Sequence, residues 1–288
     1  MEYRRRLRVL LKMRAKGIFY RNFPVCLAVT LITQAISMLG GYAAGLVLPS
    51  ANDFVYAADP TIFLPQFLQF YGILYGVFLI SAPLTMGSYA WFSDLSMQRS
   101  PKIREVFNWL GDFHLLLKAF GAMLWLTGLA ILWALAYLGI PAATIWFVTA
   151  KLSQIPVQAV VFLSGILTMV TIVGTVFTVL RVFAYLPALY LLAAHPAMRI
   201  REAFRECSHF MSGRQGEFLE LMISFAGWFL LNGFTGGLTS LYVSPYFNLT
   251  VLSFTQQARG IWLAEQGKQP DAVWTPEEQE PREDDSDV

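Results

Sequence analysis

The sequence predicts an all-α fold, a polytopic membrane helix bundle of about six transmembrane helices arranged as three hairpins. Of the 288 residues, 56% are hydrophobic and only 14% are charged, whereas soluble domains carry roughly 25% charged residues. The apolar residues come in long runs, and a run of about 18 residues or more is long enough to cross a bilayer. Lys and Arg gather in a few short segments between these runs, as they do in the cytoplasmic loops of membrane proteins.

The first segment, residues 1–22, is predicted to be a basic amphipathic helix. Eight Lys and Arg residues fall within its first 21 positions, and apolar residues recur between them at helical spacing: Leu7, Leu10, Leu11, Ala15 and Ile18. A helix of this kind lies on an anionic leaflet with its cations at the headgroups. The predicted partner is therefore a lipid bilayer with anionic headgroups at the basic helices.

Six apolar runs follow as predicted spans, at about residues 23–48, 67–90, 115–139, 157–180, 217–235 and 238–257. Small residues at intervals of four, such as Gly72 and Gly76, predict close contact between helices in the first hairpin. The returning chain of each hairpin carries a proline that is predicted to kink it: Pro83, Pro187 and Pro245.

Two further basic segments, 94–112 and 195–216, are predicted to be cytoplasmic amphipathic helices that precede the second and third hairpins. They share the pattern Ile-Arg-Glu-x-Phe at 103–107 and 200–204, which indicates either an internal threefold repeat or a coincidence between basic helices. The tail from 264 to 288 is polar and acidic, and is predicted to be disordered.

The cations also predict the orientation in the membrane. Apart from Lys151 and Arg181, all of the 21 Lys and Arg residues fall in segments that this topology places on one side. The positive-inside rule makes that side cytoplasmic. We therefore expect a multi-pass protein of the cell (plasma) membrane with both termini in the cytoplasm.

Short motifs between residues 181 and 257 follow the order and spacing of a known family. They are Leu186–Ala193, Arg201–Phe204, Met211–Gly213, Ser224–Trp228, a Gly-rich turn at 233–237, and Pro245–Tyr246. The segment resembles the uncharacterised bacterial integral membrane family catalogued as domain of unknown function 975. The resemblance implies a polytopic protein of the bacterial plasma membrane and implies no activity.

Five polar residues in or beside the spans are candidates for ligand or lipid contact. Arg181 is either a partner for a lipid phosphate or substrate anion, or a cation that reaches the interface. Glu217 and Glu220 lie on one face at the start of the fifth span. They would either bind a cation or be stabilised there by the positive end of the helix dipole. Asn232 and Asn248 lie within spans and would either join helices by hydrogen bonds or line a polar pathway.

No catalytic or metal-binding pattern accompanies these residues, so the sequence predicts neither an enzyme nor a cofactor. The basic start and acidic end of the chain do not form one nucleic-acid face. Our first hypothesis is a non-enzymatic organising, regulatory or assembly component with membrane-protein partners, acting through its basic surface helices. The alternative is a transporter or lipid-handling protein with a cavity between Pro-kinked helices.

Overall fold

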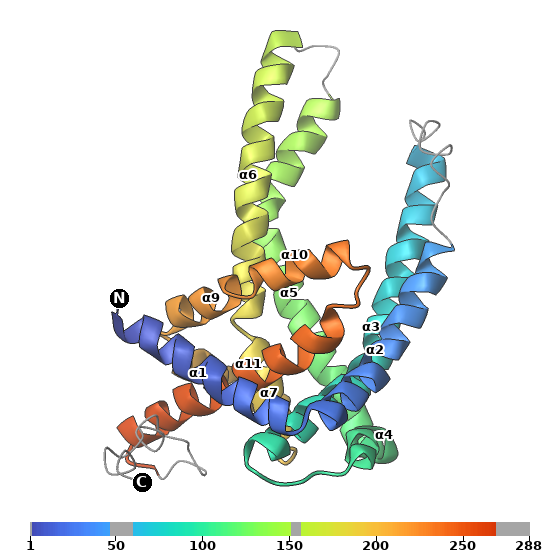
Figure 1. Cartoon of the computed structure of the whole chain (residues 1–288). Coiled ribbons are helices and arrows are strands. Elements are labelled where there is room, and N and C mark those ends of the chain that lie inside the picture. The colour runs from blue at the N-terminus through green and yellow to red at the C-terminus, as the bar shows by residue number, and fades with distance from the viewer. Residues whose placement is uncertain (1, 47–59, 151–156, 269–288) are drawn as a thin grey trace, which may run out of the picture.

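A computed structural model describes residues 2–46, 60–150 and 157–268, and all regular structure in these ranges is helical (Figure 1). Lys151 and the predicted tail beyond residue 268 lie outside the described residues. The elements in chain order are α1 (Glu2–Arg21), α2 (Phe23–Gly45), α3 (Pro60–Ser96), η2 (Ile103–Phe107), α4 (Asn108–Gly111), α5 (Phe113–Ala150), α6 (Val157–Phe183), α7 (Leu186–Ala194), α8 (Ile200–Phe210), α9 (Gln215–Ile223), α10 (Ala226–Phe234) and α11 (Ser240–Glu265).

Five stretches of these helices are long and apolar enough to cross a membrane: Phe23–Gly40, Leu68–Ser96, Phe113–Gly139, Val161–Ala194 and Gln215–Phe234. The sixth predicted span, 238–257, forms most of α11, which is not among the five. Within α11 an almost unbroken run from Leu249 to Thr255 is buried inside the protein. Polar residues of α11, including Ser253 and Gln257, are buried with this run.

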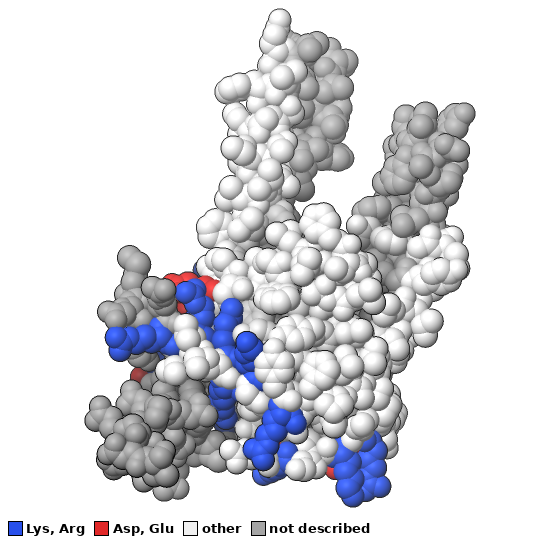
Figure 2. Space-filling view, viewed as in Figure 1, with Lys and Arg blue, Asp and Glu red and all other residues white. Residues whose placement is uncertain are grey.

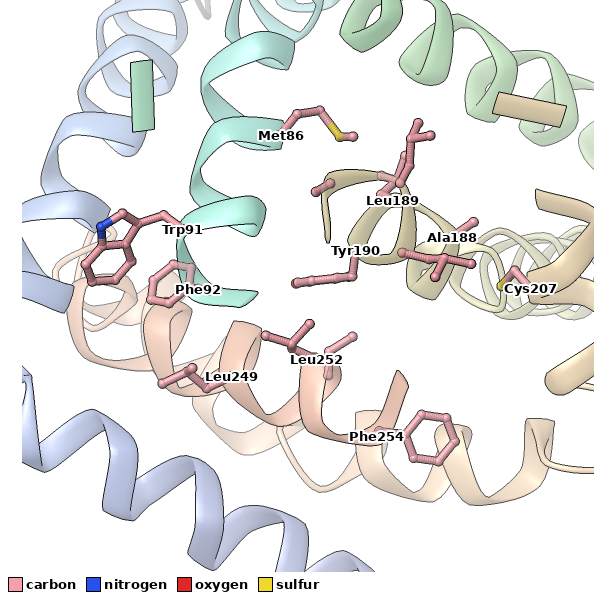
Figure 3. Packing of buried hydrophobic residues seen from close by; sticks show 14 of the residues in the cluster. Met86, Trp91, Phe92, Ala188, Leu189, Tyr190, Cys207, Leu249, Leu252 and Phe254 are labelled. Carbon is pink, nitrogen blue, oxygen red and sulfur yellow. The ribbon is translucent and has the colours of Figure 1, made fainter. Parts of the chain in front are cut away.

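We call the packed lower part of the molecule the base; it consists of α1, the second half of α3, α7, α8 and α11. These helices contact one another although they are distant in sequence. Figure 3 shows the middle of the base, where Phe92 of α3, Tyr190 of α7 and Leu252 of α11 lie around the space between their three helices. Large aromatic and aliphatic side chains of this kind contribute most to the packing energy of a core.

Two helix pairs extend from the base, α2 with α3 and α5 with α6, and they diverge from each other in Figure 1. A Cβ atom added to Gly40 of α2 would come within 2.3 Å of the Val77 side chain of α3, whereas Cβ atoms at Gly72 and Gly76 would meet nothing within 4 Å. The two helices therefore approach each other at Gly40, and not at the predicted pair of glycines. In the other pair, α6 is exposed along nearly its whole length.

The apolar face of α1 packs into the protein. Leu11, Ala15 and Phe19 recur at intervals of four and are buried, and α1 lies along α11. At the end of this contact the Tyr20 and Tyr242 hydroxyl groups are 3.0 Å apart. The apolar face that the sequence predicts is thus buried within the protein, largely against α11.

The second basic segment, 94–112, differs from the single predicted helix. It contains the short elements η2 and α4, and of its apolar residues Val106 and Trp109 are buried. A Cβ atom at Gly87 of α3 would lie 1.9 Å from the Val106 carbonyl oxygen, so η2 rests directly on the α3 backbone. The neighbouring apolar side chains Ile103 and Phe107 remain exposed.

The helices α9 and α10 run across the molecule near the lower ends of the two pairs (Figure 1). The predicted span 217–235 is divided at Ser224 and Phe225 into the helices α9 and α10, each of nine residues. Lys12 of α1 lies at this break, where its Nζ donates to the Ser224 carbonyl (3.4 Å) and sits 4.5 Å from the centre of the Phe225 ring. Burial of the Lys12 ammonium group lowers its pKa, and the positive charge of the nearby Arg8 lowers it further.

Candidate functional site

Arg181 lies at the end of α6, beside α5. Its guanidinium carbon is 5.0 Å from the centre of the Trp133 ring, a distance typical of a cation–π contact. Arg181 also lines an apolar cavity of about 210 Å³ between α6 and α9, together with Phe177, Phe218 and Met222. A cation in the lining of a largely apolar cavity is suited to an amphiphile with a negative headgroup.

The predicted glutamates, Glu217 and Glu220, both lie on α9, before the break at Ser224. Glu220 Oε2 is 3.9 Å from Arg8 Nη1 of α1, and the two side chains are 41% and 32% exposed. An ion pair with this exposure contributes less than about 1 kcal/mol. Glu217 lies in the first turn of α9, where the helix dipole favours a negative charge.

The two asparagines have different surroundings. Asn248 of α11 accepts a hydrogen bond from the Tyr190 hydroxyl of α7 (2.8 Å), and the Tyr190 ring stacks on Tyr89 of α3 with centroids 4.1 Å apart. Asn248 thus joins α11 to α7, and the stacked Tyr190 ring joins α7 to α3. Asn232 of α10 keeps its side-chain oxygen buried, and no group of the described residues donates to it.

A third amide, Gln34 of α2, also joins helices. Its Nε2 donates to Ser244 Oγ (2.7 Å), and its Oε1 accepts from Ser240 Oγ (2.6 Å), both on α11. Gln34 and Asn248 therefore hold helices together, whereas the side-chain oxygen of Asn232 accepts no hydrogen bond from the described residues.

The three prolines are all buried, on helices that pack against one another in the base. Pro83 and Pro245 lie inside α3 and α11, each of which continues through its proline. Pro187 lies at the start of α7, after a break between α6 and α7. The first turn of a helix has no intrahelical partner for its N–H groups, so a proline fits there without loss of a hydrogen bond.

The strongest polar cluster of the base is one that the sequence did not single out. Arg259 Nε of α11 donates to Glu206 Oε1 of α8 at 2.6 Å, and the two side chains are 15% and 14% exposed. Arg259 Nη1 lies 3.3 Å from Nε2 of His195, and His195 Nδ1 lies 3.2 Å from the Leu191 carbonyl. Since a carbonyl only accepts, Nδ1 carries the proton and Nε2 accepts from the guanidinium.

A small cavity of about 40 Å³ adjoins this cluster and is lined in part by Tyr190, His195, Gln256 and Arg259. A cavity of this size holds a few water molecules at most, so it is suited to hydrating the cluster rather than to binding a solute. The sequence signal for the cluster is the helical spacing of Leu252, Thr255, Arg259 and Leu263, which places Arg259 on a face that is otherwise apolar or uncharged.

Among the residues that the structure describes, no group of three or more His, Cys, Asp or Glu side chains could hold a metal ion. Cys26 and Cys207 are both buried free thiols. Cys207 Sγ lies 3.6 Å from the Ala184 carbonyl, and burial raises the pKa of Cys207 to about 12.

The helical fold and its five apolar candidate spans define a membrane protein of the all-α class. The chain matches the model of a family described as "Protein of unknown function (DUF975)" over residues 1–260, and it belongs to that family. The match extends the resemblance from the segment 181–257 to nearly the whole chain, and it ends before the acidic tail. No curated protein and no solved structure matches the chain.

Proposed function

We propose that this protein is a non-enzymatic assembly component of the bacterial plasma membrane that binds other membrane proteins. The observation that carries the proposal is a stripe of small hydroxyl side chains on the outer surface of α6. Ser164, Thr168 and Thr175 lie on one helical face and are exposed. Their neighbours on the opposite face, Phe162 and Met169, are large, apolar and 72% and 67% exposed.

The two faces of α6 suit different surroundings. The hydroxyl groups of Ser164, Thr168 and Thr175 donate to backbone carbonyls of α6 itself at 2.8 Å. The hydroxyl hydrogens therefore already have acceptors, and the small side chains leave this face of the helix without protrusions. Small residues let another helix backbone approach closely, and this close packing is what drives association between helices in a bilayer. Phe162 and Met169 suit lipid chains. The α6 surface therefore favours one protein-facing side and one lipid-facing side.

Photo-crosslinking in native membranes tests this proposal. A benzophenone amino acid at Thr168 or Thr175 is expected to give discrete protein adducts, while the same group at Phe162 or Met169 on the same helix gives adducts with lipid. The double variant Thr168→Leu/Thr175→Leu keeps the helix apolar and is expected to lose the adducts formed from Ser164. Equal protein crosslinking from both faces would contradict a dedicated interface.

The proposed orientation places both termini and the basic segments of the chain in the cytoplasm. Figure 2 shows the Lys and Arg side chains gathered over the lower part of the molecule, and the described upper parts of the two pairs carry none in that view. This distribution supports cytoplasmic termini by the positive-inside rule. A cysteine at Ser208 of α8, introduced with Cys26 and Cys207 replaced, is expected to resist an impermeant maleimide on intact cells; its labelling would reverse the topology.

The non-enzymatic part of the proposal rests on how the polar groups are used. Glu206 and Arg259 neutralise each other, and Asn248 is engaged by Tyr190. These contacts join α8 and α7 to α11, which gives the groups a structural role. Turnover of any membrane lipid or peptide by the purified chain, lost on Glu206→Gln, would overturn this assignment.

A second candidate function is lipid handling, and the apolar cavity at Arg181 favours it. In that case Arg181 would hold a negative headgroup while Phe177, Phe218 and Met222 contact the acyl chain. Arg181→Gln would then reduce the recovery of anionic lipid with the purified protein, whereas an assembly role predicts unchanged lipid content and unchanged crosslinking from Thr168.

A further inference from the structure

A cleft of about 510 Å³ lies between α1 and the end of α3, separate from the cavities at Arg181 and Arg259. Three arginines line it: Arg14 and Arg21 from α1, and Arg99 from the segment that follows α3. The cleft is larger than either of those two cavities, and more cations line it. It also adjoins the start of α2, the first of the candidate spans.

Two of the arginines in the cleft have neighbours from the end of α3 and the segment after it. Arg14 Nη2 donates to the Ser96 carbonyl at 3.3 Å, and Arg99 Nη1 lies 2.8 Å from Asp94 Oδ1. Among the described residues, no acidic side chain belongs to the lining of the cleft itself. A guanidinium has five N–H donors, so Arg99, which is 70% exposed and bound to Asp94 through Nη1, keeps donors for a further acceptor.

The arginines also differ in exposure, in a way that suits binding. Arg14 is partly buried and held at the Ser96 carbonyl, while Arg21 and Arg99 in the same lining are exposed. The side chain of Arg99 is 70% exposed. Arg14 is held in place, and the side chains of Arg21 and Arg99 are exposed enough to adjust to a bound anion.

Neutral donors complete the lining. Asn22, Gln98 and Ser100 lie around the arginines, and the Asn22 amide donates one N–H to the Ile18 carbonyl at 3.1 Å, which leaves its second N–H. A tetrahedral phosphoryl group has several acceptor oxygens and pairs with arginine in bidentate fashion. Arginines together with amide and hydroxyl donors are the groups that such an anion requires.

From this geometry we infer that the cleft between α1 and the end of α3 binds a phosphoryl anion, presented either by the headgroup of an anionic phospholipid or by a soluble phosphate compound. The cleft is independent of the proposed protein interface on α6. The competing role for the three arginines is to neutralise the carbonyl groups at the ends of α1 and α3, which would affect stability without binding any anion.

Calorimetric titration of the full-length chain in a neutral detergent tests the inference. The probes are inorganic phosphate, short-chain phosphatidylglycerol and, as a headgroup without net charge, short-chain phosphatidylcholine. We expect saturable binding of at least one of the first two probes, weakened about tenfold by Arg21→Gln or by Arg99→Gln, which corresponds to about 1.4 kcal/mol. Arg201→Gln removes an exposed cation from α8 and is expected to leave the affinity unchanged.

The two sources of the anion give different results. Binding of phosphatidylglycerol that millimolar inorganic phosphate does not displace assigns the cleft to a lipid headgroup, and binding of inorganic phosphate with the same variant profile assigns it to a soluble compound. Absence of saturable binding by either probe overturns the inference. Equal weakening by Arg201→Gln and Arg21→Gln also overturns it, because the effect would then be general electrostatic attraction.

Arg14 separates binding from structural support. Arg14→Lys keeps the positive charge but not the bidentate geometry, so we expect the thermal midpoint to be retained and the affinity to fall severalfold. A variant that loses thermal stability but binds either anion as tightly as the parent chain would identify Arg14 as a structural group, and would contradict the inference.

Discussion

Removal of the negative charge at Glu206 is expected to destabilise the base strongly. Glu206 and Arg259 are 14% and 15% exposed, and their contact is 2.6 Å. Breaking a buried ion pair by neutralising one partner costs about 3–5 kcal/mol, because the other charge stays buried. Arg259 keeps a contact to His195 and lies beside a cavity that admits water, so we expect Glu206→Gln to cost about 3 kcal/mol, at the lower end of this range.

The free energy of unfolding in mixed detergent micelles, followed by tryptophan fluorescence, measures this cost. The matched control is Glu265→Gln on α11: Glu265 is 65% exposed and 3.6 Å from Arg214, so its loss is expected to cost less than about 1 kcal/mol. The double variant Glu206→Gln/Arg259→Met leaves no buried charge at this pair and is expected to recover part of the stability. A cost for Glu206→Gln no larger than that of the control would refute the reasoning.

Three further predictions concern packing, helix contacts and thiol chemistry. Gly87→Ala is expected to destabilise by about 1–3 kcal/mol, since its Cβ would meet the η2 backbone, whereas Gly72→Ala on the same helix has open space; equal melting temperatures would contradict this. Gln34→Leu removes two hydrogen bonds to α11 and is expected to cost about 0.6–2 kcal/mol in the same unfolding assay. Burial raises the pKa of Cys207 from 9.0 to about 12, so its thiolate fraction at pH 8 is about a thousandfold below that of the unfolded chain. Maleimide labelling followed by mass spectrometry checks this, and labelling of Cys207 at the same rate in the native and unfolded chain would contradict it.

The helical class and most of the apolar runs follow directly from the sequence, because a run of apolar residues has few alternatives to a membrane helix. Periodicity also identifies which face of a helix is apolar, as in α1. It does not identify what covers that face, and in α1 the cover is α11 rather than lipid. A one-dimensional pattern is the same whether the apolar face meets acyl chains or another helix.

Contacts between residues that are far apart in the sequence could not be predicted from it. Arg259 meets residues 53 and 64 positions away in Glu206 and His195, and nothing local in the sequence specifies these partners. Similarly, Gly72 and Gly76 fit a contact motif, but the actual approach of α2 to α3 occurs at Gly40. Which glycine is used depends on how the two helices are rotated, and tertiary packing determines that rotation.

The central proposal is that α6 presents an interface to another membrane protein. The mass of the particles extracted from native membranes into lipid nanodiscs tests it most directly, because a single chain has a mass of 32.4 kDa. We predict particles whose protein mass exceeds that of one chain, and their reversion to single chains in the double variant Thr168→Leu/Thr175→Leu. Single chains with lipid alone in the parent protein would contradict the proposal.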